Sequence, residues 1–342
     1  MLKVKKLGVV LKHTSLPFEN QAVLNPTCWQ EGNFVHMLYR AVNKKMKSCV
    51  GYARLEGPLK VESRWKKPVI EREYKYEKKG VEDPRVVKVG DTFYITYVAH
   101  DGKNAVTALA VSKSLIKFKK KGIISPHITY DEAEDLFRNS KLKDKYFFFE
   151  SYYKDKAGKD VLLWEKDIFL FPEKFNGRFA MIHRILPDIQ IIYFKNFKQL
   201  NLKYWKKYLK RLSNYVVLEN KYWYESRNIG GGCPPIKTKK GWLLIYHGVE
   251  ELNKIKRYHA GAALLDLKNP KKVIGRLKEP LFSPDKPWEK RGDVNNVVFP
   301  TGTAIFGDQL YIYYGAADKR IAVAAVNLNS LIKELTKQNA KK

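Results

Sequence analysis

One strand pattern recurs five times along the 342-residue chain, and it limits the possible folds more than any other feature. Each copy has a turn signal, then a run of aromatic and β-branched residues, and then a polar residue. The copies lie at residues 32–40, 90–101, 176–184, 241–247 and 307–318. Partner segments, mostly small and apolar, follow them at residues 50–55, 105–115, 189–194, 258–267 and 321–331. Each unit is therefore predicted to contain a strand, a polar loop and a second strand.

The spacing of these units predicts the architecture. The turn glycines are about 58, 87, 64 and 66 residues apart, and the longest gap contains a charged segment at about 131–159 that we interpret as an insertion. Five strand-rich units of this length predict an all-β fold, a single five-bladed β-propeller over residues 1–342. A pair of β-sandwiches would not repeat one signature five times, and a solenoid usually has shorter repeats. Short helices are expected at 197–212 and after Asn329, with a basic tail at about 335–342.

Composition narrows the classes of partner and the compartment. The net charge of +30 would attract nucleic acid, acidic membranes or phosphate, but the lysines are spread along the whole chain. The sequence has no nucleic-acid-binding motif, so a non-catalytic basic propeller that binds nucleic acid or protein is a minor alternative. Three distant cysteines, no signal peptide and no long apolar run favour a cytoplasmic protein. Because His and Cys lack metal-ligand spacing, we expect no metal and no cofactor.

Polar residues end the repeated strands, and a propeller would bring these ends to one mouth of its axial channel. Cations and carboxylates gathered among aromatic residues are typical of a site for a sugar and a phosphate. The alternative is that each charged side chain only solvates the end of its own strand. The residues concerned are Arg40, His100, Asp101, Arg184, His247 and Asp318.

Two further clusters stand out. In Glu82-Asp83-Pro84-Arg85, adjacent carboxyl groups beside an arginine favour a separation of their pKa values, although the same residues would suit a surface turn. In the segment 228–235, three consecutive glycines would let backbone N–H groups approach an anion, although they would also suit a flexible loop. This segment matches neither a P-loop nor a dinucleotide fingerprint.

Several motifs together resemble glycoside hydrolase family 130. They are Asn25-Pro26 with Tyr39-Arg40, and the segments 82–85, 169–174, 231–238, 241–248 and 313–318. The matches keep the order of the family and extend from about residue 20 to 325. The resemblance implies a five-bladed propeller and an enzyme that cleaves β-mannosides. Most members are inverting phosphorylases, and some are hydrolases.

The resemblance also implies roles for individual residues. Asp83 would be the catalytic acid, acting through the 3-hydroxyl of the mannose that is cleaved off. The substrate-binding set would be Asn25, Arg40 and Asp318, to which the motif and strand-end arguments add Arg85, His100 and Asp101. The phosphate-binding set would be Lys166, Arg184, His247 and Asn228. Many family phosphorylases have a lysine where this chain has Asn228, next to Arg227. Either residue could substitute for that lysine, or phosphate binding is weakened and a hydrolase is favoured.

The reaction class follows from how many carboxylates the site needs. Inverting hydrolysis requires an acid and a separate base, whereas phosphate is already an anionic nucleophile that needs cations to position it. Glu225 is the nearest candidate for a base. The sequence therefore predicts an inverting phosphorylase with inorganic phosphate as co-substrate, giving α-mannose 1-phosphate, and a hydrolase as the alternative. Residues 130–133 and 185–190 resemble members acting on β-1,2- rather than β-1,4-linked mannosides. The insertion could be a lid that sets chain length or a contact in a homo-oligomer.

Overall fold

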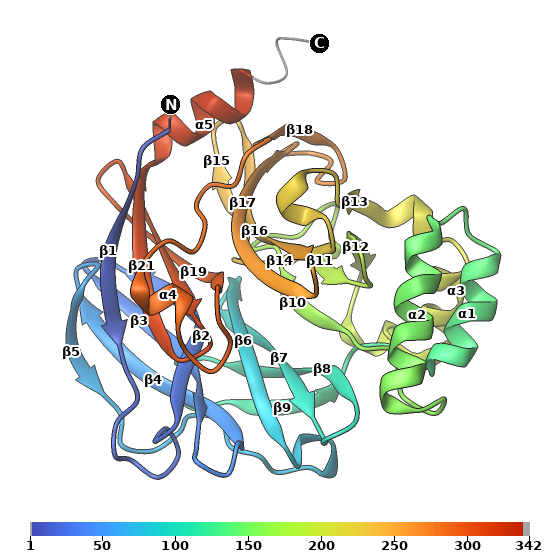
Figure 1. The fold of residues 1–342 in the computed structure, drawn as a ribbon, viewed down its shortest axis with the longest axis horizontal. Helices are drawn as coiled ribbons and strands as arrows, with labels where there is room; N and C mark the ends of the chain where they lie inside the picture. Colours follow the sequence, from blue (N-terminus) through green and yellow to red (C-terminus); the bar gives the residue numbers. More distant parts are fainter. Residues whose placement is uncertain (1, 338–342) are drawn as a thin grey trace.

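The computed structural model describes residues 2–337, and β-strands dominate it (Figure 1). The largest sheet has the order β2-β3-β4-β6-β7-β8-β9, with β5 paired to β4. Its strands are β2 (Ala22–Glu31), β3 (Phe34–Val42), β4 (Ser48–Glu56), β5 (Lys60–Arg64), β6 (Gly80–Val89), β7 (Thr92–His100), β8 (Ala105–Ser112) and β9 (Lys119–Ile123). The two halves of this sheet are joined through one parallel bridge, between Ser48 of β4 and Gly80 of β6.

Three smaller sheets complete the described β-structure. One contains β10 (Lys166–Leu170), β11 (Phe179–Arg184), β12 (Ile189–Phe194) and β13 (Val216–Leu218). The next contains β14 (Asn228–Gly231), β15 (Ile236–Thr238), β16 (Gly241–Leu252), β17 (Ile255–Leu265) and β18 (Val273–Arg276). The last contains β1 (Val4–Leu11), β19 (Val298–Phe306), β20 (Gln309–Ala316) and β21 (Arg320–Asn327). Because β1 pairs with β21, the first and last strands of the chain close one sheet together (Figure 1).

The predicted strand pairs are confirmed in all five units. The repeated strands are β3, β7, β11, β16 and β20, and each pairs antiparallel with the strand that follows it. Another strand precedes the repeated strand in each unit, namely β2, β6, β10, β14 or β19. These preceding strands face the middle of the molecule: β2 contacts β6 and β19, and β10 contacts β6 and β14. In each unit, the strand nearest the centre is therefore the one that precedes the repeated strand.

The charged insertion folds into two helices, α1 (Tyr130–Arg138) and α2 (Asp144–Ala157). Thr129 caps α1 by accepting a hydrogen bond from the backbone N–H of Glu132, a capping-box arrangement. Lys154 of α2 forms ion pairs with Asp131 and Glu134 of α1, which ties the two helices together. Figure 1 shows them with α3 (Leu202–Leu209) at one side of the sheets, and Trp205 of α3 is buried in a shared core.

The remaining helices agree with the sequence analysis in outline. The helix predicted at 197–212 consists of a 3-10 turn (Phe197–Gln199), α3 and a second 3-10 turn (Leu212–Tyr215). The C-terminal helix α5 (Leu328–Lys337) packs through Leu331 and Leu335, and the basic tail beyond residue 337 lies outside the described residues. The short α4 spans Pro287–Lys290. Among residues 2–337, no helix is long and apolar enough to span a membrane.

Candidate active site

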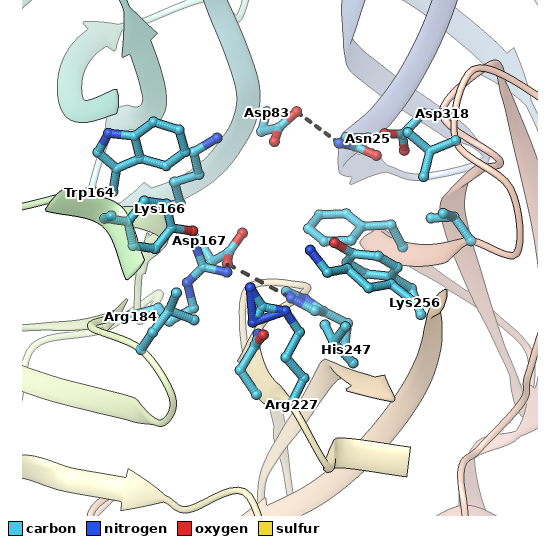
Figure 2. A pocket seen from close by; sticks show the side chains of 18 of the residues that line it. Asn25, Asp83, Trp164, Lys166, Asp167, Arg184, Arg227, His247, Lys256 and Asp318 are labelled. Carbon is cyan, nitrogen blue, oxygen red and sulfur yellow. Dashed lines mark hydrogen bonds and ion pairs between the residues drawn. The ribbon is translucent and has the colours of Figure 1, made fainter. Parts of the chain in front are cut away.

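Three of the central strands carry a β-bulge with a non-glycine residue at positive φ. The residues are Asn25 in β2 (φ 47°), Asp83 in β6 (φ 48°) and Asp167 in β10 (φ 59°). In each strand the pairing register shifts across that residue. A bulge redirects a side chain, and Asn and Asp tolerate positive φ better than most residues. Figure 2 shows all three side chains at the same pocket.

This pocket is a cavity of about 280 Å³ into which the strands of all four sheets project side chains. Two carboxylates, an amide and an arginine from β2, β3, β6 and the turn after β20 form one wall, which we call the carboxylate wall. The opposite wall, which we call the cation wall, comes from β10, β11, the start of β14, β16 and β17, and it holds most of the basic side chains (Figure 2). The carboxylate wall consists of Asn25, Arg40, Asp83 and Asp318, and the cation wall of Lys166, Asp167, Arg184, Arg227, Asn228, His247 and Lys256.

On the carboxylate wall, Asp83 is held by two neighbours. Asn25 Nδ2 donates a hydrogen bond of 2.8 Å to Asp83 Oδ1, and Arg40 Nη1 lies 3.5 Å from the same oxygen. Arg40 is held in turn by Glu82, whose Oε1 accepts from Arg40 Nη2 at 2.7 Å. The predicted association of Asp83 with Arg40, Lys166, Arg184 and Asp318 is therefore found in one cavity.

The two acids of this wall have opposite pKa shifts. Burial raises the pKa of Asp83, but the positive charges of Arg40, Arg85 and Lys166 outweigh it, and the net pKa lies below its ordinary value. Burial raises the pKa of Asp318 to about 6, more than Arg40 lowers it, and the charge of Asp83 adds to the rise. With these neighbours Asp83 is the anion, and Asp318 is the acid that is protonated more readily.

On the cation wall, Arg184 and His247 converge on Asp167. Arg184 Nη1 lies 3.1 Å from Asp167 Oδ2, and His247 Nε2 lies 3.9 Å from the same oxygen. Burial, with a smaller opposing effect from Asp167, lowers the pKa of His247 to about 4, so its ring is neutral at pH 7. Both ring nitrogens of His247 and Arg184 Nε are buried without a hydrogen-bond partner among the described residues. These atoms are available to a ligand.

Three of the predicted substrate-binding residues do not line the cavity. Arg85 is buried behind it, where Nε donates to Gly232 O at 2.6 Å and Nη1 donates to the carbonyl of Asp83, so it supports the bulge. His100 Nδ1 accepts from the backbone N–H of Gly102, and Asp101 Oδ1 accepts from the backbone of a tight turn. His100 and Asp101 therefore organise the β7–β8 turn, which is the local role that was weighed against the site.

Two other expectations are corrected. Glu225 is not a base in the cavity, because it is buried in a separate cluster where it accepts from Tyr246 and Arg276, each at 2.7 Å. The glycines at 230–232 do not open a loop to an anion. A Cβ on Gly230 would lie 2.4 Å from His247 Cε1, and one on Gly231 would lie 2.5 Å from Phe169. These glycines let neighbouring side chains pack against β14.

Other lining residues were not singled out by the sequence analysis. Asp167 is one of them, and no proline follows it to mark its bulge as one follows Asn25 and Asp83. The others come from the insertion and from neighbouring strands or loops, where the repeat gives no guide. They are Tyr152, Tyr153, Lys156, Trp164, Val249, Lys256, Tyr258, Val294, Val297 and Phe299. Leu186 also lines the cavity, and it lies in the segment 185–190 noted in the sequence.

An all-β scaffold with a polar cavity, lined by carboxylates on one wall and basic side chains on the other, is typical of the class of carbohydrate-active enzymes. The chain belongs to glycoside hydrolase family 130: the family model, described as β-1,4-mannooligosaccharide phosphorylase, matches residues 8–337. The resemblance seen in the sequence is thereby confirmed.

Curated relatives and a solved structure agree with this membership. The chain is 34% identical to a 1,2-β-oligomannan phosphorylase of Thermoanaerobacter sp. (strain X514), over 97% of this chain and 99% of the relative. It is 35% identical to a β-1,2-mannobiose phosphorylase of the same organism, over 90% and 91%. Its fold is similar to that of β-1,2-mannobiose phosphorylase from Listeria innocua, with a TM-score of 0.73, 23% identity and coverage of 98% and 99%.

Proposed function

We propose that this protein is an inverting phosphorylase that cleaves β-1,2-linked mannosides with inorganic phosphate. One observation carries the proposal: Lys166, Arg184 and neutral His247 line the same cavity as Asp83. Cations and a neutral imidazole suit a phosphate dianion, because arginine binds it through two N–H groups and lysine adds a point charge. The preference for β-1,2 over β-1,4 linkages is supported by the two Thermoanaerobacter relatives, which are named for β-1,2-linked substrates.

In the proposed reaction, a phosphate oxygen attacks the anomeric carbon of mannose from the face opposite the leaving sugar. The new C–O bond forms as the glycosidic bond breaks, and the electron pair of that bond goes to the glycosidic oxygen. That oxygen takes a proton from Asp83, relayed by the 3-hydroxyl of the mannose. The products are α-mannose 1-phosphate and a sugar shortened by one unit. Asn25, Arg40 and Asp318 would hold the mannose beside Asp83.

This proposal requires Asp83 to gain a proton before the bond breaks. The surrounding cations keep its pKa low. A phosphate dianion on Lys166 and Arg184 would offset those charges and raise the pKa of Asp83 and of Asp318. Binding of phosphate would thus favour protonation of Asp83. Asp318, whose pKa is about 6, is a nearby group that also exchanges a proton with solvent in this pH range.

We also propose that the strands form five blades around this cavity. The large sheet divides at the single Ser48–Gly80 bridge into β2–β5 and β6–β9, and the other three sheets supply one group of at least four strands each. On this arrangement the bulge residues Asn25, Asp83 and Asp167 occupy equivalent places in three successive blades. The same strand position then contributes to both walls, because the bulge carries a different residue in each blade.

A hydrolase is the second candidate, and Asp167 is the observation that favours it. It is a third carboxylate in the cavity, beside Asp83 and Asp318, and its Oδ2 lacks a hydrogen bond among the described residues. However, Arg184 lies 3.1 Å from that oxygen and engages it as an ion pair. A base that must accept a proton from water is poorly served by that partner, so phosphorolysis is the better account of the cation wall.

The test is to incubate the protein with β-1,2-mannobiose, with and without inorganic phosphate. We expect mannose release and a phosphorus resonance of α-mannose 1-phosphate only when phosphate is present. Equal mannose release in both samples, with no sugar phosphate, would identify a hydrolase instead. A parallel sample of β-1,4-mannobiose should react more slowly, and the reverse order would remove the linkage assignment.

A further inference from the structure

Arg227 lies in the cation wall and is held there by the inserted helix α2. It directly precedes β14, and its side chain is only 9% exposed. Its guanidinium carbon lies 4.8 Å from the ring centre of Phe149 and 5.5 Å from that of Tyr152, both on α2. On another side, Nε lies 3.1 Å from Glu251 Oε2 at the end of β16. Two aromatic rings and one carboxylate therefore fix the orientation of this side chain.

This arrangement turns the terminal nitrogens of Arg227 toward the cavity. Its ion pair with Glu251 is made through Nε, and the residue lines the cavity. Figure 2 shows the guanidinium group pointing into the cavity beside His247 and toward Arg184. A guanidinium group that stacks on aromatic rings keeps its N–H edge available for an oxyanion, and the stacking limits the entropy lost on binding.

The surroundings of Arg227 are rich in positive charge. Lys156 of α2 and Lys256 of β17 also line the cavity, and both lie near the hydroxyl of Tyr152. Burial raises the pKa of that hydroxyl, but the charges of Lys156, Lys256 and Arg227 lower it more. This end of the cavity therefore favours an anion, and α2 contributes both a cation and the rings that hold Arg227.

We propose that Arg227 is a direct phosphate ligand, and that α2 is a positioning element for it. Arg227 would take the role of the lysine that this chain lacks at Asn228. The inference rests on the proposed phosphorylase function and adds to it a specific residue and a task for the insertion. A purely structural reading gives Arg227 only the task of tying α2 to β16, and that reading predicts altered stability without altered phosphate binding.

The first experiment measures phosphate directly. Arg227→Met and Arg227→Lys are compared with the unmodified protein by calorimetric titration with inorganic phosphate and by the KM for each substrate. Loss of one or two charge-assisted hydrogen bonds should weaken phosphate binding about 10- to 100-fold in Arg227→Met. Arg227→Lys should fall between, and the KM for β-1,2-mannobiose should stay within about twofold because the mannose lies on the opposite wall.

The second experiment tests the helix with matched substitutions. Tyr152→Leu removes one ring beside Arg227, and it should raise the KM for phosphate about two- to fivefold. The same change in the Arg227→Met background should have no further effect, because the coupled partner is already gone. Phe147→Leu is the control: it removes a ring from the same helix, but Phe147 packs against Phe137 of α1.

Each outcome separates this inference from the proposed function. If the unmodified protein depends on phosphate but folded Arg227→Met and Arg227→Lys bind it normally, the inference is wrong and the phosphorylase stands. If the unmodified protein neither binds nor uses phosphate, both are wrong. If Phe147→Leu weakens phosphate binding as much as Tyr152→Leu, then α2 acts through general packing and its assignment as a positioning element fails.

Discussion

The two walls of the cavity meet the cost of burying polar groups in different ways. On the carboxylate wall, Asp83 has Asn25 and Arg40 as partners, and Asn25 Oδ1 is the buried atom left without a hydrogen bond among the described lining residues. On the cation wall, both nitrogens of His247, Arg184 Nε and Asp167 Oδ2 lack such a bond. An unpaired buried polar group costs about 1–3 kcal/mol. The cation wall is therefore the less satisfied of the two until an anion arrives, whereas the acid is already fixed in place.

The largest loss of activity should follow a substitution in the carboxylate wall. Asp83→Asn keeps the shape and the contact with Asn25 but removes the transferable proton, so kcat should fall by about 10²- to 10⁴-fold. Phosphate binding measured by calorimetry should persist, because the cation wall is untouched. Retained turnover in a folded Asp83→Asn protein would remove Asp83 from the role of acid and would leave Asp318 as the candidate.

The next effect should come from the cation wall and should be confined to phosphate. Arg184→Met removes a cation but also leaves Asp167 as a buried carboxylate without its 3.1 Å partner. The double variant Arg184→Met/Asp167→Asn avoids that unpaired charge, and it should still weaken phosphate binding by about 10- to 100-fold. The measurement is the Kd for phosphate, with binding of β-1,2-mannobiose as the control. If the binding of phosphate and of β-1,2-mannobiose weakened equally, the two walls would not be separate binding surfaces.

Much of this contrast is visible in the sequence, and the reasons are local. Turn glycines and alternating apolar residues specify the repeated strands, and so Arg40, Arg184, His247 and Asp318 were found from their shared place at strand ends. The same rule failed for His100 and Asp101, because a tight turn uses both side chains locally. A position in a repeat fixes where a residue lies, but competition from neighbouring backbone groups decides where its side chain points.

The rest of the cation wall depends on contacts that no local pattern encodes. Arg227 has two aromatic neighbours from an insertion about 80 residues earlier in the chain, and Lys256 and Tyr258 come from an extended hairpin. Asp167 was missed because its bulge is followed by isoleucine, whereas proline follows Asn25 and Asp83. Glycines 230–232 were misread because close packing and anion binding both require glycine, and only the positions of His247 and Phe169 distinguish them.

A stability measurement would sharpen the contrast between Asp83 and Asp318. The pKa of Asp318 is raised from 3.8 to about 6 by burial, so above pH 6 the folded state carries the cost of a buried charge. Asp318→Asn should therefore raise the free energy of unfolding by about 1–3 kcal/mol at about pH 8, while lowering activity. The gain should shrink as the pH falls through 6 and vanish below about 4, where both states are protonated. A gain that does not change with pH would mean that the charge of Asp318 is not its source.

The smallest expected effect is the uptake of protons when an anion binds, and it would show that the two walls are electrostatically coupled. If an anion on the cation wall raises the pKa values of Asp83 and Asp318, its binding must take up protons from solvent, at most about one per anion. Sulfate is the suitable probe because it does not itself titrate near neutral pH. Calorimetric titrations at about pH 6.5, in two buffers with different ionisation enthalpies, should reveal the uptake, and Asp318→Asn should reduce it. Binding of sulfate with no proton exchange would mean that the walls are electrostatically independent. Protonation of Asp83 would then have to depend on binding of the sugar alone.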